Sequence, residues 1–210
     1  MSARLLYVMD PMCSWCWGFA PVAQALIEQA AQAGVDTCLV VGGLRRGSSA
    51  LDASTRRYIL DHWQAVGEAT GQPFDFDGAL PDGFVYDTEP ACRALVTARE
   101  LDASRLWPLL ALMQRAFYQA GTDITRAPQL VALAEQVGFD RERFRALFDH
   151  ADTRAATEAD FAWTQRLGIA GFPTLLAERN GQLALLTNGF QPLERLQPLL
   201  ARWLEQAACA

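Results

Sequence analysis

Apolar residues follow a short-period pattern at the two ends of the chain and a helical one in its middle. Residues 4–9 form a continuous apolar run that stops at an Asp-Pro pair, which predicts a buried strand. Apolar residues at spacings of three and four predict a helix over 21–33. Because proline is well tolerated only in the first turn of a helix, Pro21 indicates a kinked helix that begins near Cys13. A second strand is expected over 37–41, which completes a βαβ unit.

The middle of the chain, from about residue 48 to residue 165, is predicted to be mostly helical. Helical periodicity recurs over 54–69, 89–101, 104–120, 127–137 and 140–151. Residues suited to cap a helix start stand near each of these segments, at Ser54, Thr88, Ser104, Thr125 and Asp140. Two glycines are expected to end helices, Gly121 and Gly138. A loop rich in Pro, Gly and Asp separates the first two helices.

Strand patterns return near the end of the chain. Two short apolar segments, 174–178 and 182–187, flank an Asn-Gly pair, which is a strong hairpin signal. The last segment, 191–207, is an amphipathic helix. The order is therefore βαβ, a helical block, and then ββα.

With the helical block removed, this order gives a thioredoxin fold, an α/β protein with a central mixed sheet flanked by helices. We predict that residues 1–47 and 166–210 form one discontinuous thioredoxin-like domain. Residues 48–165 are predicted to be an inserted helical domain between its βαβ and ββα halves.

Composition and net charge exclude several classes of partner. Half of the 210 residues are apolar, so the chain can bury a core without disulfides. The net charge is −6 and the 18 basic residues, all arginine, are scattered, which excludes a basic face for nucleic acid. No signal-peptide pattern and no apolar run of about 18 residues is visible. We expect a cytoplasmic protein with neither nucleic acid nor a membrane as partner.

The cysteines carry the candidate chemistry. Cys13-Ser14-Trp15-Cys16 lies between a predicted strand and a predicted helix. The unpaired N–H groups and the positive end of the helix dipole favour a thiolate at Cys13, which would attack a disulfide, and Cys16 would then resolve the mixed disulfide. The alternatives are two packing residues or half of a zinc site. We predict no metal site, because no second pair at ligand spacing is formed by the remaining cysteines and histidines, Cys38, Cys92, Cys209, His62 and His150.

A second motif, Gly171-Phe172-Pro173-Thr174, precedes the predicted hairpin. Together with the N-terminal Cys-x-x-Cys motif, it resembles the DsbA-like branch of the thioredoxin superfamily, whose members carry a helical insertion. Within that branch, residues 10–18 are most similar to FrnE-like cytoplasmic proteins. Two further similar segments are Gly42-Gly43-Leu44-Arg45 and Gln114-Arg115-Ala116-Phe117. The resemblance implies a thiol–disulfide oxidoreductase or isomerase.

The resemblance also implies a cis bond between Phe172 and Pro173, with Pro173 beside the sulfurs. The backbone of Phe172 would then pair with an extended substrate as an added strand. The alternative is an ordinary trans proline at the start of an edge strand. Ser14 and Trp15, between the cysteines, are expected to contact substrate. Strongly oxidising DsbA proteins have histidine where this chain has Trp15, so a less oxidising couple is expected.

Several residues near the two motifs allow two interpretations each. Asp10 could take part in proton transfer to Cys16, or it could end the strand and cap the turn. Arg45 and Arg46 could bind an acidic group such as a glutathione carboxylate, or form a solvated surface. Trp17 and Phe19, with Met12 and Trp15, could hold apolar substrates or belong to the core.

The remaining cysteines and the two histidines are not expected to take part in the chemistry. We expect Cys38 and Cys92 to be core thiols and assign no role to His62 or His150. Cys209 stands next to the C-terminus and could oxidise adventitiously.

No bound cofactor is expected, and the predicted partners are protein or peptide thiols and disulfides, with glutathione as a candidate redox partner. The sequence does not predict an oligomeric state. Two other functions stay open: a glutathione-dependent isomerase or transferase of the kappa or hydroxychromene-carboxylate type, and a non-catalytic thioredoxin-fold adaptor. The first type generally has one serine where this chain has two cysteines.

Overall fold

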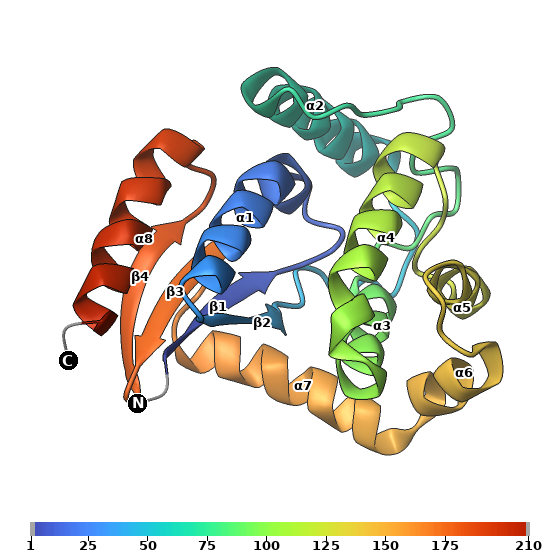
Figure 1. Ribbon diagram of the computed structural model, residues 1–210. Helices are drawn as coiled ribbons and strands as arrows, with labels where there is room; N and C mark the ends of the chain where they lie inside the picture. Colours follow the sequence, from blue (N-terminus) through green and yellow to red (C-terminus); the bar gives the residue numbers. More distant parts are fainter. Residues whose placement is uncertain (1–2, 209–210) are drawn as a thin grey trace.

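The computed structural model describes residues 3–208 and is built around a four-stranded mixed sheet (Figure 1). The strand order is β2-β1-β3-β4, formed by β1 (Ala3–Met9), β2 (Asp36–Val41), β3 (Thr174–Arg179) and β4 (Gln182–Asn188). β1 pairs in parallel with β2 and antiparallel with β3, and β3 pairs antiparallel with β4. This arrangement is the predicted thioredoxin fold.

Two helices from opposite ends of the chain pack together on one face of the sheet. α1 (Ser14–Gln32) begins directly after Cys13 and contains Pro21, and α8 (Leu193–Ala208) packs against it. The β3–β4 hairpin turns at Asn180 and Gly181, whose φ angles of 51° and 79° are those expected of an Asn-Gly turn. The strand and helix predictions for both ends of the chain are confirmed.

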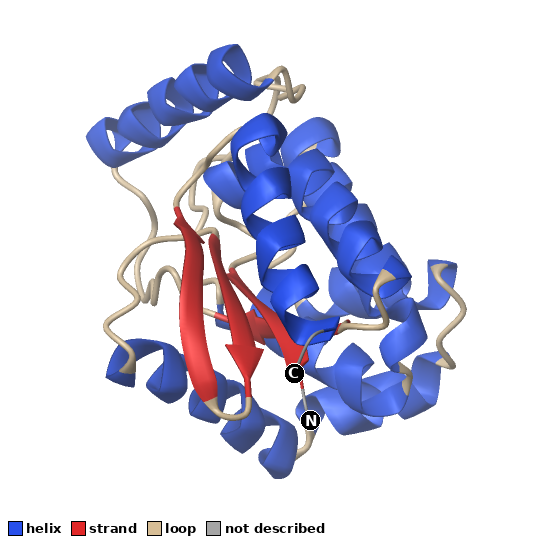
Figure 2. Ribbon diagram, turned by 60° about the vertical axis from the view of Figure 1, so that its left-hand side comes forward, coloured by secondary structure: helices blue, strands red, loops and turns tan. Residues whose placement is uncertain are grey.

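The segment between β2 and β3 contains six α-helices and one short 3-10 helix. In chain order the helices are α2 (Ala53–Thr70), α3 (Glu89–Leu101), η1 (Ala103–Arg105), α4 (Leu106–Ala120), α5 (Ala127–Gln136), α6 (Arg141–Asp149) and α7 (Ala151–Arg166). α7 packs against β2, on the side of the sheet away from α1, and Figure 2 shows helices on both sides of the sheet. One hydrophobic cluster runs through the sheet and these helices. The helical segment does lie between the βαβ and ββα parts of the chain, as predicted. Its division from them as a separate domain stays a prediction.

The sequence did not identify α7 as a separate helix. The helix predicted over 140–151 ends at Asp149, and His150 begins the next one, with its Nδ1 accepting a hydrogen bond from the Asp152 N–H at 3.3 Å. The buried face of α7 consists largely of threonines, Thr153, Thr157 and Thr164, with Phe161. Polar residues on the buried face remove the apolar stripe that helix prediction depends on.

Three predicted helix caps are wrong and two are at the predicted place. Asp52, not Ser54, caps α2 by accepting the Thr55 N–H at 2.7 Å. The N-cap of α5 is Arg126 and not Thr125. Ser104 lies within the 3-10 helix η1, which precedes α4. Asp140 and Thr88 are N-caps as predicted. The hydroxyl of Thr88 does not cap α3, however, because it donates to the Asp10 carboxylate. Gly121 and Gly138 follow their helices with positive φ, which confirms both stops.

Among residues 3–208, no helix is long and apolar enough to cross a membrane.

Candidate active site

The Cys-x-x-Cys motif lies at the junction of β1 and α1. Cys13 is the N-cap of α1, with extended backbone angles, and its carbonyl accepts the N–H groups of Cys16 at 2.9 Å and Trp17 at 3.1 Å. Cys16 therefore lies one turn into the helix, on the same side as Cys13. The N–H groups of the first turn and the helix dipole are directed toward Cys13.

The two cysteines differ in access. Cys16 is completely buried, whereas Cys13 is 6% exposed and lies in a cavity of about 290 Å³. The walls of this cavity, which we name the Cys13 cavity, come from the start of α1, the loop after β2, α2, Tyr86 and Phe172. The walls cover Cys13, so that a partner reaches its sulfur only through the cavity.

The second predicted motif lies directly against the first. The Phe172–Pro173 bond is cis, as the resemblance implied, and Pro173 is buried. The Cys13 Sγ lies 3.6 Å from the Phe172 carbonyl oxygen, to which its thiol donates. The ring of Phe172 covers Gly42, where a Cβ would lie only 2.1 Å from the Phe172 Cζ. A glycine at position 42 is thus required for the close approach of the loop after β2 to the loop that contains Phe172.

Burial controls the chemistry of Cys16. It raises the pKa of the Cys16 thiol well above the usual value of 9.0, and a hydrogen bond to the Cys13 sulfur and the charge of Cys13 act in the same direction. Cys16 is therefore a protonated thiol in the reduced protein at neutral pH. Burial also raises the pKa of the neighbouring Tyr7 well above its usual value of 10.0, and the charges of Cys16 and Cys13 act in the same direction.

Asp10 is fully buried three residues before Cys13. Its Oδ1 accepts the Met12 N–H at 2.8 Å. Its Oδ2 accepts the Leu44 N–H at 2.7 Å, the Thr88 hydroxyl at 2.7 Å and the Cys92 thiol at 3.4 Å. Burial raises the pKa of Asp10 despite these hydrogen bonds, which act in the opposite direction.

These contacts support the reading in which Asp10 caps the turn. The carboxylate joins the cysteine loop to the loop after β2 and to the start of α3. Cys92 is buried as predicted, and its pKa is raised by burial and by the charge of Asp10. A proton role for Asp10 stays a prediction.

Trp15 lies at the edge of the Cys13 cavity and is half-buried. Its indole Nε1–H donates to the Nε2 of His62 on α2 at 2.9 Å, and its ring packs against Phe190 with centroids 5.9 Å apart. Sequence reasoning assigned no role to His62, because nothing local links it to a residue 47 positions away. Ser14 also lines the cavity, whereas Trp17 and Phe19 are buried, so their core reading is confirmed.

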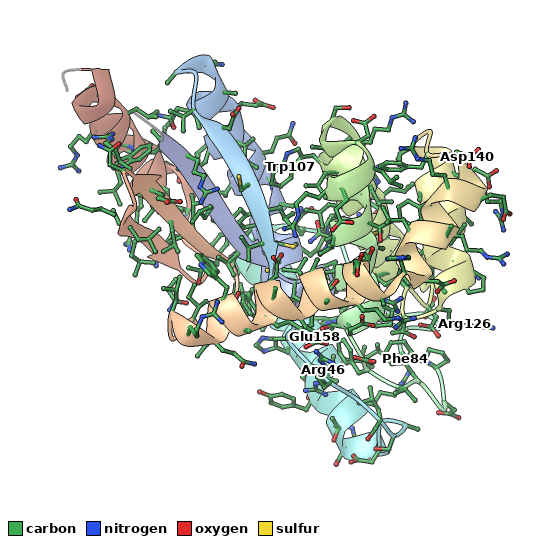
Figure 3. The ribbon with its side chains drawn as sticks, turned by 90° about the horizontal axis from the view of Figure 1, so that it is seen from below. Arg46, Phe84, Trp107, Arg126, Asp140 and Glu158 are labelled. Atoms are coloured by element: carbon green, nitrogen blue, oxygen red, sulfur yellow. The ribbon has the colours of Figure 1, made fainter. Side chains whose placement is uncertain are left out.

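The two adjacent arginines point to different places. Arg45 lines the Cys13 cavity, with its guanidinium 5.1 Å from the centre of the Tyr86 ring. Arg46 instead pairs with Glu158 of α7 and lies over the ring of Phe161, and Figure 3 shows it beside Glu158. Of the two, only Arg45 is placed to meet a molecule bound near Cys13.

The structure contains no cluster of three or more His, Cys, Asp or Glu side chains suited to a metal within the described part of the chain. Cys38 is half-buried on β2, so the prediction of a core thiol holds only in part there. Cys209 lies outside the described residues.

A cysteine pair at the start of a helix, facing a cis-proline loop in a mixed sheet, defines the class of thioredoxin-fold thiol–disulfide oxidoreductases. A model of the DSBA-like thioredoxin domain matches residues 4–201. The chain therefore belongs to the DSBA-like thioredoxin domain family and is a thiol–disulfide oxidoreductase of the DsbA-like type.

Solved structures of two proteins resemble the whole chain. A candidate protein disulfide isomerase from Nitrosomonas europaea is 39% identical, with a TM-score of 0.91, over 98% of this chain and 99% of that one. The cytosolic disulfide reductase DsbM from Pseudomonas aeruginosa is 32% identical, with a TM-score of 0.77, over 99% of this chain and 100% of that one. DsbM has also been solved with glutathione, and that structure covers 95% of this chain and 98% of its own at 31% identity and a TM-score of 0.77.

A curated relative is more distant. The ClpXP adapter protein SpxH from Halalkalibacterium halodurans is 23% identical over 174 residues, which are 80% of this chain. The matched region spans 56% of the length of that relative.

Proposed function

We propose that Cys13 is the attacking residue and Cys16 the resolving residue of this oxidoreductase. The Cys13 thiolate attacks one sulfur of a substrate disulfide, forms a mixed disulfide and releases the other substrate sulfur as a thiolate. Cys16 then loses its proton and attacks the Cys13 sulfur. A Cys13–Cys16 disulfide forms, and the substrate leaves with two thiols. An external thiol such as glutathione returns the pair to its reduced form by two further exchanges.

One observation carries this assignment. Cys13 combines the start of a helix, a cavity open to partners and a sulfur 3.6 Å from the Phe172 carbonyl. Cys16 lies behind it, protonated and closed to solvent, so it reacts with the Cys13 sulfur after that sulfur has formed the mixed disulfide. This order of access favours attack by Cys13 and resolution by Cys16.

The cavity also supports the expected substrates. In this proposal the backbone of Phe172 pairs with an extended peptide, and Ser14 and Trp15 contact the substrate; all three residues line the Cys13 cavity, which supports these roles. The guanidinium of Arg45 suits a carboxylate, such as either of those in glutathione. The relative solved with glutathione supports this thiol as a partner. We further propose that the enzyme works in the cytoplasm without a bound cofactor.

Trapping of the mixed disulfide tests the proposal. In Cys16→Ala the resolving thiol is absent, so incubation with a disulfide-containing peptide should leave the peptide attached to Cys13, as detected by mass spectrometry. Cys92→Ala removes another buried thiol and is the matched control, in which no adduct should accumulate. An adduct in Cys92→Ala, or none in Cys16→Ala, would contradict the proposal.

The direction of electron flow follows from the reduction potential of the pair. With Trp15 in place of an imidazolium next to Cys16, we propose a reductase or isomerase. Equilibration with glutathione buffers should then give a value near that of thioredoxin, about −270 mV, and a value near about −120 mV would identify an oxidant.

A non-catalytic adaptor is the second candidate, favoured by the similarity to SpxH. An adaptor holds its partner through surface contacts and does not need its thiols. Changing both Cys13 and Cys16 to serine separates the two functions: an adaptor keeps its partner in a pull-down, whereas the proposed enzyme loses all disulfide exchange and all covalent capture.

A further inference from the structure

A second cavity, which we name the rear cavity, lies between α1 and α4. It has a volume of about 550 Å³, and it shares no lining residue with the Cys13 cavity among the described residues. Figure 1 shows α1 and α4 beside each other. The volume lies within the range of small-molecule sites, roughly 300–1,000 Å³.

The walls of the rear cavity are mainly aromatic and aliphatic. Tyr7 from β1, Trp17 from α1 and Trp107 from α4 contribute rings, and prolines and aliphatic side chains contribute most of the rest. The rings of Tyr7 and Trp107 are stacked, with centroids 6.2 Å apart and planes 25° apart. Figure 3 shows Trp107 on the side of α4 that faces α1. Glu28 and Arg115 add charged groups to the lining, and the three rings favour a flat aromatic ring over a flexible chain.

One polar group in this apolar lining lacks a partner. Gln114 is 1% exposed and lines the rear cavity, and its Nε2 forms no hydrogen bond with any described residue. A buried amide without a hydrogen-bond partner destabilises the folded protein, because it has lost its hydrogen bonds to water. Its presence in an apolar wall therefore indicates a hydrogen-bond acceptor, such as a carbonyl oxygen, within the cavity.

We propose that the rear cavity is a binding site for a small planar aromatic molecule that carries a carbonyl group. The ring lies among Tyr7, Trp17 and Trp107, and the carbonyl oxygen accepts the Gln114 Nε2–H. The motif Gln114-Arg115, which the Cys13 chemistry does not use, thereby acquires a role. The site lies behind the redox pair, because Trp17 directly follows Cys16 in α1 and Tyr7 lies on β1, the strand that leads into the cysteine loop.

Two probes test the site, benzamide and its carbonyl-free counterpart toluene. In a ¹H–¹⁵N NMR titration of the full chain, benzamide should shift the side-chain amide signals of Gln114, which are identified by their loss in Gln114→Leu. Toluene should shift the indole signals of Trp17 and Trp107 without moving that amide. Removal of the amide in Gln114→Leu should weaken benzamide binding by about threefold to tenfold, in line with one neutral hydrogen bond, and leave toluene binding unchanged.

Filling the cavity provides the control. Ala111 lines the rear cavity from α4, so Ala111→Phe should abolish binding of both probes. Ala155→Phe adds the same ring at an exposed position of α7 and should bind both as the wild type does. The proposal is overturned if millimolar benzamide leaves the Gln114 amide unshifted, the result expected if the cavity holds only water. Equal binding by wild type and Ala111→Phe overturns it as well.

Discussion

Cys13 and Cys92 both lie at the beginning of a helix, yet their surroundings are opposite. Cys13 is the N-cap of α1 and opens into a cavity, whereas Cys92 is the fourth residue of α3 and is completely buried. The Cys92 thiol donates to the Asp10 carboxylate, and burial and this charge raise its pKa. A helix dipole alone therefore does not make a thiol reactive. Access to a partner and the absence of a nearby anion are required as well.

The largest expected difference between the two sites is in catalysis. Cys13→Ser removes the attacking sulfur, so glutathione-driven reduction of a disulfide peptide should fall to the uncatalysed rate. Cys92→Ser keeps a hydroxyl that can still donate to Asp10, and it should reduce the peptide at the wild-type rate. The two rates are compared in a continuous assay with a fluorescent disulfide peptide. If the effects of the two substitutions were reversed, the assignment of the site would be wrong.

Asp10 joins the cysteine loop to Cys92 in α3 through its hydrogen bonds, and Asp10→Asn should weaken this connection. An amide has only one acceptor oxygen, so one of the groups that donate to Asp10 would face an N–H₂ group instead. We expect a loss of about 1–3 kcal/mol in the free energy of unfolding, measured by urea denaturation.

The pH dependence of this loss has a definite sign. Because the pKa of Asp10 is raised in the folded protein, its protonated form is favoured by folding. The contribution of Asp10 to stability is then fully present below the ordinary value of 3.8 and declines as pH rises through the folded pKa. The difference in unfolding free energy between wild type and Asp10→Asn should therefore shrink over that interval. A difference that grows with pH would mean that the folded pKa is lowered.

Gly42 holds the Phe172 ring close to the loop after β2, beside Cys13. A methyl group at this position would overlap the Phe172 ring, so Gly42→Ala should displace the loop that faces Cys13. We expect a cost of about 1–2 kcal/mol in unfolding free energy and a raised KM for peptide disulfides. Gly67→Ala, in α2, is the control, because its methyl would lie 3.3 Å from the Phe74 ring and the KM should not change.

The smallest effect is expected at His62. His62→Leu removes the acceptor of the Trp15 indole at the edge of the Cys13 cavity. Loss of one exposed neutral hydrogen bond should raise the KM for peptide disulfides by about twofold to fivefold and leave kcat unchanged. Steady-state kinetics would show this split, and an equal loss in kcat would instead place His62 in the chemical step.

Much of the fold and the reactive pair could be predicted from the sequence because the signals are local. The strand before Cys13, the helix after it and the Asn-Gly hairpin each depend on neighbouring residues, and all three are present. The contacts that the sequence could not supply join distant positions: Trp15 to His62, Asp10 to Cys92, and Phe172 to Gly42. α7 was missed because threonines, rather than aliphatic residues, form much of its buried face.

Thiol mapping of the reduced wild-type protein tests the central claim most directly. Iodoacetamide is added under native conditions, and peptide mass spectrometry follows the alkylation of each cysteine with time. Cys13 should be modified in the folded protein, while Cys16 and Cys92 stay protected until the protein is unfolded. Alkylation of Cys92 or Cys16 as fast as that of Cys13 would contradict the claim that the cavity makes Cys13 the reactive thiol.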